Sequence, residues 1–327
     1  MKAITFNRTG LLSLLLIFSF TANAGNNSGN DNVKSNDVVL SANIIVEDQT
    51  QSLALFSSVN NAVVTSASAD TVSAYNNSEN LYGYRALEYS GCNLNYDLPY
   101  RLFVPEDYQE GEKYPLVIFL HGAGRRGSDN VSQIKDMTGA LAFVKSEVQE
   151  KHPSFVLAPQ CPKTENWVGK SYSGARLAKS LEDIKPSSAN LMLKGLVKEI
   201  LDKYDIDSDR IYLTGQSMGG ISTWYFALTH PNKFAAIAPV CGRSFPSEAS
   251  VIADMPVWAF HGAEDKTITP EGSREMVKAL EKAGNTKVKY TEYPNVGHDS
   301  WVQAYTQDAD NNGEVDIVEW IFSQKRE

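Results

Sequence analysis

The five residues from Gly215 to Gly219 read Gly-Gln-Ser-Met-Gly, so that a serine stands near the centre of a turn flanked by glycines. A β-rich stretch, Arg210 to Thr214, precedes this pattern, and an apolar stretch typical of a helix follows it. Glycine at both flanks lets strand and helix approach closely, and the turn exposes the serine hydroxyl. The free N–H groups at the helix start can stabilise a developing oxyanion. The pattern therefore predicts that Ser217 is a nucleophile.

A serine nucleophile needs a base, and the base needs an acid that orients it. In the fold that carries this turn, the acid and then the histidine follow the serine along the chain. Asp265 comes on the loop after the strand pattern MPVWAFHG, and His298 comes on the loop YPNVGHDSW after the last strand pattern. Of the five histidines, only His298 stands that late on such a loop. We predict His298 as the base and Asp265 as the acid, with two competing acids, Glu264 and Asp299.

An oxyanion hole needs two backbone donors. One is predicted to be the N–H group of Met218, directly after the nucleophile. The other is expected at Ala123, because the run Gly122-Ala123-Gly124 follows the strand pattern YPLVIFLHG and lets the backbone approach a substrate. His121 and His261 each precede a glycine at a strand end, so we expect them to order those loops.

Strand and helix patterns alternate along most of the chain. Apolar runs that end in glycine or polar residues include YPLVIFLHG, SFVLAPQ, RIYLTGQS and FAAIAPVCG. Helical spacing of apolar residues falls between them, for example within SSANLMLKGLVKEILDKY. Repeated alternation of this kind predicts an α/β fold with a mostly parallel sheet and helices on both faces.

The chain has 327 residues and a net charge of −9, with no block of Lys and Arg, which argues against nucleic acid or an anionic membrane as partner. Its first residues carry Lys2 and Arg8, then a short apolar run, then Ala22-Asn23-Ala24. This arrangement predicts a signal peptide over residues 1–24, cleaved after Ala24, and export to the periplasm or medium without a membrane anchor. We expect a polar, partly disordered segment over 25–78 and a catalytic domain over 79–327.

Three cysteines remain in the chain, Cys92, Cys161 and Cys241. Export permits disulfides, but an odd count leaves at least one thiol unpaired within the chain. The sequence does not fix the pairing, and all three could equally be small buried side chains.

The motifs YRLFVPEDYQEGEKYPLVIFLHGAGRRGSDN, APQCP, DRIYLTGQSMGG, HGAEDKTITP and GHDSW together resemble a known group of proteins. They are similar to secreted α/β-hydrolases of the predicted peptidase and carboxylesterase group, of the prolyl-oligopeptidase type, which is related to feruloyl, acetylxylan and polyhydroxybutyrate esterases. The resemblance covers roughly Tyr84 to Arg326. It implies the α/β-hydrolase fold, with Ser217, Asp265 and His298 as the triad and Ala123 and Met218 as the oxyanion donors. It also suggests that Trp167, after APQCP, borders the substrate, where it could stack on a ring or simply pack.

The leading functional hypothesis is the hydrolysis of carboxylic esters, either polysaccharide-linked esters or small aryl and acyl esters, with no cofactor for catalysis. A serine peptidase is the first alternative, although the chain lacks the large gating domain typical of that relative. An inactive exported binding module is the second, and the complete order of serine, acid and histidine argues against it.

The stretch DADNNGEVDIVE, residues 308–319, resembles an EF-hand loop. Gly313 falls at the sharp turn of that pattern, and all the ligands offer oxygen, as calcium requires. We predict a structural calcium site whose ligands are Asp308, Asp310, Asn312, Glu314, Asp316 and Glu319. The alternative is a solvated acidic turn that links two helices.

Overall fold

The structure is a computed structural model, and it describes residues 80–91, 94, 96–169, 180–306 and 316–326, together with two short strands, β1 (Leu16–Ile17) and β2 (Asn43–Ile44). The chain divides into two compact units, Met1–Val72 and Ser73–Glu327. In the first unit β1 and β2 pair in antiparallel. Apart from these strands, the predicted signal peptide and most of the polar segment lie outside the described residues. The second unit holds the residues predicted to take part in catalysis.

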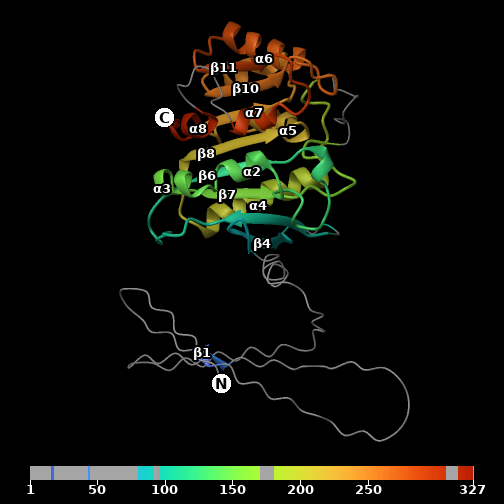
Figure 1. The fold of residues 1–327 in the computed structure, drawn as a ribbon. Helices are drawn as coiled ribbons and strands as arrows, with labels where there is room; N and C mark the ends of the chain where they lie inside the picture. The colour runs from blue at the N-terminus through green and yellow to red at the C-terminus, as the bar shows by residue number, and fades with distance from the viewer. Residues whose placement is uncertain are drawn as a thin grey trace, which may run out of the picture. The chain divides into compact units, whose positions relative to one another are not determined.

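A nine-stranded sheet forms the centre of the second unit, in the order β11-β10-β9-β8-β6-β7-β5-β4-β3 (Figure 1). Neighbours from β7 to β11 pair in parallel, whereas β3, β4 and β5 add an antiparallel edge. The mostly parallel sheet confirms the predicted fold class. Its strands are β3 (Asn80–Leu81), β4 (Tyr84–Tyr89), β5 (Leu98–Phe103), β6 (Tyr114–Leu120), β7 (Phe155–Pro159), β8 (Ile206–Gln216), β9 (Ala236–Val240), β10 (Val257–Gly262) and β11 (Val288–Tyr293).

Helices cover both faces of the sheet, as predicted. The α-helices are α2 (Thr138–Ala142), α3 (Ser146–Lys151), α4 (Ser188–Lys203), α5 (Met218–Thr229), α6 (Glu271–Lys282), α7 (Trp301–Thr306) and α8 (Ile317–Phe322), and two 3-10 helices are η1 (Ala123–Arg125) and η2 (Pro246–Ile252). Side chains of α4, α5 and α6 pack into one core, and side chains of α2, α7 and α8 pack into a second core. None of the described helices is long and apolar enough to cross a membrane.

Strand β6 explains how one sheet supports two cores. Successive side chains of a strand point to opposite faces, so its apolar run serves both sides. Leu116, Ile118 and Leu120 belong to the first core, and Val117 and Phe119 belong to the second. The carboxyl ends of the parallel strands then meet along one edge, where loops gather functional groups.

Candidate active site

The turn between β8 and α5 holds Ser217 in an unusual backbone conformation. Its φ is 55° and its ψ is −116°, a region that an L-residue other than glycine rarely adopts. The surroundings fix this conformation, because the Ser217 N–H group lies 3.0 Å from the carbonyl oxygen of Val240 and 3.2 Å from Sγ of Cys241. The carbonyl of Ser217 accepts the N–H of Ile221 at 2.9 Å. The hydroxyl is therefore presented on a rigid turn.

The glycines that flank this turn are required by close packing. A Cβ atom on Gly219 would lie 1.8 Å from the carbonyl oxygen of Leu120, and one on Gly215 would lie 2.4 Å from the same atom. Both contacts involve the backbone of β6, which cannot rotate away. The absence of side chains at these two positions brings the start of α5 against the end of β6.

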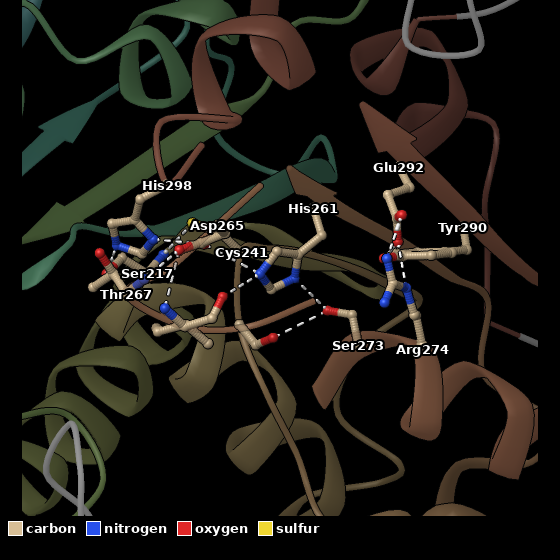
Figure 2. A network of polar contacts seen from close by, with 12 residues as sticks. Ser217, Cys241, His261, Asp265, Thr267, Ser273, Arg274, Tyr290, Glu292 and His298 are labelled. Atoms are coloured by element: carbon tan, nitrogen blue, oxygen red, sulfur yellow. Dashed lines mark hydrogen bonds and ion pairs between the residues drawn. The ribbon is translucent and has the colours of Figure 1, made fainter. Parts of the chain in front are cut away.

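The structure places Ser217, His298 and Asp265 in one chain of hydrogen bonds, which Figure 2 shows. Nε2 of His298 lies 2.8 Å from Oγ of Ser217, and Nδ1 lies 2.7 Å from Oδ2 of Asp265. The imidazole can therefore take the hydroxyl proton while its other nitrogen donates to the carboxylate. This is the geometry of a nucleophile, a base and an orienting acid.

The environment of Asp265 holds its carboxylate in a fixed orientation. Its side chain is buried, and its Oδ1 accepts the N–H groups of Thr267 at 2.8 Å and Ile268 at 3.0 Å. The His298 side chain, in contrast, keeps 23% of its surface exposed. Among the described residues, no hydrogen bond or ion pair joins His298 to either competing acid, Glu264 or Asp299.

The two predicted oxyanion donors lie at the starts of neighbouring helical turns. Met218 begins α5, and Ala123 begins η1. A Cβ atom on Gly122 would lie 3.5 Å from Cβ of Ser217, so the loop before Ala123 packs against the nucleophile. Within the described part of the chain, neither the Met218 nor the Ala123 N–H group donates to another residue. Both donors are thus available to a substrate oxygen.

The side chain of His121 connects the loop that carries Ala123 to Cys161, just after β7. Its Nε2 accepts the N–H of Cys161 at 2.9 Å, and its Nδ1 lies 2.7 Å from the carbonyl oxygen of Gly122. These partners fit a neutral ring with its proton on Nδ1. Burial lowers the pKa of His121 to about 4. The prediction that His121 orders its loop agrees with these contacts.

Lowering the pH is expected to weaken the hydrogen bonds that His121 makes to this loop. An exposed histidine in the unfolded chain titrates near pH 6.5, whereas His121 titrates at about 4, so the unfolded state binds more protons between these values. The contribution of neutral His121 to the free energy of unfolding is fully present above about pH 6.5. It is lost as the pH falls, by on the order of 3 kcal/mol at pH 4. Urea unfolding of wild type and His121→Gln across this range measures it. An identical pH dependence in both proteins would contradict the assignment.

Sequence reasoning missed three side chains that hold the oxyanion loop. The buried Gln160 donates from Nε2 to Oδ1 of Asp129 at 2.8 Å and to the carbonyl oxygen of Arg125 at 3.2 Å. Nε of Arg126 donates to the carbonyl oxygen of Ala123 at 3.0 Å. Burial alone would raise the pKa of Asp129, but hydrogen bonds from Ser132, Val131 and Gln160 outweigh it and hold that pKa below its usual range. The available signal was the polar glutamine directly after an apolar strand.

Trp167 is a packed side chain in this structure. It is completely buried (0% exposed), and its ring meets the edge of His121 at a centroid distance of 5.5 Å. These contacts are those of a packing side chain, and contact of Trp167 with a substrate stays a prediction. A different tryptophan, Trp301, is only partly buried and stands edge-on to His298, at 5.4 Å between ring centroids.

Most of the predicted calcium loop lies outside the described residues, including Asp308, Asp310, Asn312 and Glu314. Asp316 caps α8, because its Oδ1 accepts the N–H of Glu319 at 2.7 Å. The Glu319 carboxylate lies 2.6 Å from Nζ of Lys151 and 3.3 Å from Nε2 of His152. The hydrogen bond from Lys151 lowers the pKa of Glu319. Asp316 and Glu319, the two predicted ligands that the structure describes, therefore already have partners within the protein.

The sequence model of the phospholipase/carboxylesterase family matches residues 107–310, which is more than half of the 327 residues. The chain belongs to the phospholipase/carboxylesterase family. This membership confirms the resemblance to carboxylesterases that the motifs indicated. The match spans Ser217, Asp265 and His298, together with the loop that carries Ala123.

This member of the phospholipase/carboxylesterase family is 37% identical to a thermostable esterase of known structure, with a TM-score of 0.67 over 75% of this chain and 64% of that one. It is 28% identical to acyl-protein thioesterase 1 homolog 2 of Dictyostelium discoideum over 199 residues, 56% of this chain and 85% of that protein. It is 26% identical to a bifunctional acetylxylan esterase/xylanase of Neocallimastix patriciarum over 127 residues, 36% of this chain. The chain spans 19% of that bifunctional enzyme's length.

Proposed function

We propose that this chain is a serine esterase that hydrolyses carboxylic esters through an acyl-enzyme on Ser217. The observation that carries the proposal is the continuous hydrogen-bonded chain from Ser217 through His298 to Asp265, next to two N–H groups that are free to bind an oxyanion. Family membership supports the same chemistry. No cofactor takes part in the proposed reaction.

Each proposed step uses groups already in position. Oγ of Ser217 attacks the ester carbonyl carbon while Nε2 of His298 takes its proton. The carbonyl oxygen becomes an oxyanion, which the N–H groups of Met218 and Ala123 bind. The C–O bond to the alcohol then breaks, and His298 returns its proton to the leaving oxygen. Water, deprotonated by His298, finally attacks the acyl-enzyme and releases the acid and Ser217.

The proposed substrates are polysaccharide-linked esters or small aryl and acyl esters. The partly exposed His298 supports a shallow site that a bulky or polymeric substrate can reach. Trp301, edge-on to His298, offers an apolar ring face or edge beside the reacting atoms. The similarity to an acetylxylan esterase/xylanase adds support for a carbohydrate-linked ester.

The test compares leaving groups with the same enzyme preparation. We expect turnover of p-nitrophenyl acetate and butyrate, because both esters present an activated leaving group to Ser217. We expect no turnover of an aminoacyl p-nitroanilide. A panel of acetylated and feruloylated oligosaccharides and an acyl thioester then ranks the acyl and leaving groups. Preferential cleavage of the anilide would favour a peptidase, and no turnover of any compound would favour a binding module.

We also propose that the protein is exported, and that the catalytic domain begins near residue 79. The charged start, short apolar run and Ala22-Asn23-Ala24 support removal of residues 1–24. The first residue of the mature chain would then be Gly25, which N-terminal sequencing of the exported protein can check. An intact Met1 on the exported protein would contradict the cleavage.

We further propose a structural calcium ion at residues 308–319, outside the reacting groups. The six oxygen ligands and Gly313 at the turn support it. Glu319 would have to exchange its contact with Lys151 for the ion. With calcium at about 100 times its Kd, the unfolding free energy should increase by roughly 2.7 kcal/mol.

The melting temperature in millimolar calcium and in EDTA tests this site. We expect calcium to raise the melting temperature of wild type and not that of Asp308→Ala. Lys151→Met is the matched control, because it breaks the ion pair with Glu319 but removes no ligand, so its response to calcium should persist. Equal melting of wild type in both buffers would remove the site, and a shift that persists in Asp308→Ala would place the ion elsewhere.

A further inference from the structure

The ring of His261, near the end of β10, has polar contacts on both nitrogens although it takes no part in the proposed steps. It is completely buried (0% exposed). Its Nε2 lies 2.8 Å from the carbonyl oxygen of Ile268 and 3.2 Å from Oδ2 of Asp265. A carbonyl and a carboxylate can only accept, so Nε2 carries a proton and donates to both.

The other nitrogen settles the protonation state. Nδ1 lies 2.8 Å from Oγ of Ser273, which also lies 3.0 Å from the carbonyl oxygen of Gly242. The single hydroxyl proton can serve only one of these contacts at a time. Burial lowers the pKa of His261, so the ring is neutral near pH 7 and Nδ1 accepts the Ser273 proton. Ser273 therefore keeps the proton of the ring on the nitrogen that faces Asp265.

Asp265 is thus held by four donors that divide between its two oxygens. Oδ1 takes the two backbone N–H groups of Thr267 and Ile268. Oδ2 takes Nδ1–H of His298 and Nε2–H of His261 (Figure 2). Without His261, only the partly exposed His298 would remain on Oδ2.

We propose that His261 is a positioning residue of the triad, whose Nε2–H group holds Oδ2 of Asp265 in the orientation that accepts the Nδ1–H of His298. The inference rests on the proposed function only in requiring that Ser217, His298 and Asp265 act as a triad. His261 touches no reacting atom, so its effect passes entirely through Asp265.

The other charged groups nearby cannot replace this donor. Glu292 carries a negative charge toward His261, but its oxygens lie 2.6 and 2.8 Å from the guanidinium of Arg274, and Tyr290 donates to it at 2.6 Å. Within the described residues, Cys241 after β9, Glu292 on β11 and His298 before α7 interact with the Asp265–His261 pair. Arg274 on α6 and Tyr290 on β11 act on Glu292, and Asp299 acts on Cys241.

The rate of labelling by a fluorophosphonate tests the proposal, because it reports on the nucleophile whatever the natural ester is. His261→Met removes the donor at similar size, whereas His261→Gln keeps an N–H group where Nε2 stands. We expect His261→Met to label about 10- to 100-fold more slowly, the loss from removing one hydrogen bond to a charged group. We expect His261→Gln to recover most of that rate.

The pH profile of labelling separates positioning from general damage. A carboxylate that has lost a donor attracts the protonated imidazole of His298 more strongly, so the acidic limb of the rate profile should move to higher pH in His261→Met and return in His261→Gln. In an Asp265→Asn background, His261→Met should cost nothing further, because its route of action is gone. Ser273→Ala removes only the contact to Nδ1. It should slow labelling and move the acidic limb in the same direction as His261→Met, but by a smaller amount.

The outcomes distinguish this inference from the proposed function. If wild type is not labelled, the proposed function fails. The positioning role fails if wild type is labelled and His261→Met shows the same labelling rate and the same acidic limb. It also fails if His261→Met lowers the rate by the same factor in the Asp265→Asn background. If His261→Met does not fold, Ser273→Ala decides the question, and an unchanged acidic limb in that variant would overturn the proposal.

Discussion

Replacing Ser217 by alanine is expected to lower kcat for a p-nitrophenyl ester by a factor of about 10⁴ to 10⁶. The reason is that, among the described residues, Ser217 supplies the hydroxyl that is hydrogen-bonded to His298, with Oγ 2.8 Å from Nε2. The backbone conformation, with φ at 55°, is equally strained for alanine and serine, so the melting temperature should hardly change. Steady-state kinetics and intact-mass analysis of fluorophosphonate labelling measure the two effects.

The control for this variant is Ser250→Ala, which removes an exposed serine on η2. It should keep both turnover and a single covalent label. Labelling that survives in Ser217→Ala would show that another residue is the nucleophile. A large fall in melting temperature would instead attribute the lost activity to unfolding.

Replacing Gly219 by alanine is expected to lower the unfolding free energy by about 3 kcal/mol or more and to reduce activity as well. The added Cβ would lie 1.8 Å from the carbonyl oxygen and 2.5 Å from the carbonyl carbon of Leu120. Because both atoms belong to the backbone of β6, α5 must move as a whole, and this movement displaces Ser217 and Met218 from the oxyanion loop. Urea unfolding and ester turnover measure the effect.

Gly124→Ala is the matched control, because nothing lies within 4 Å of a Cβ atom built at Gly124. Its unfolding free energy should stay within about 0.5 kcal/mol of wild type. Equal stability of the two variants would mean that the contact between α5 and β6 yields easily, and the packing argument for Gly219 would be wrong.

The sequence predicts the sheet, the helices on both faces and the order of the candidate catalytic loops, because these features depend on periodicity and on local turns. Ser217 sits between a strand pattern and a helix pattern, and Asp265 and His298 each follow a strand pattern. The structure places all three within hydrogen-bonding distance. Their catalytic roles remain predictions for the experiments above.

Contacts between loops distant in the chain could not be predicted in the same way. Gln160 reaches Asp129 and His121 reaches Cys161, and no local pattern records either pairing. The burial of Trp167 depends likewise on how its loop packs against His121, so the sequence left stacking and packing open. The sequence showed His261 only as a residue before a glycine at a strand end, and it did not predict the contact of His261 with Asp265.

The two described cysteines have a practical consequence for following how this protein opens. Cys161 and Cys241 are both buried and free, and burial raises the pKa of both thiols well above its usual range. Alkylating reagents attack the thiolate, so neither thiol should react while the structure is closed. Iodoacetamide incorporation, resolved by peptide mass, then reports local opening at two places. Cys241 reports on the turn that carries Ser217, and Cys161 reports on the loop that His121 holds. Equal rates would indicate that both places open in a single event, and unequal rates would reveal which one opens first.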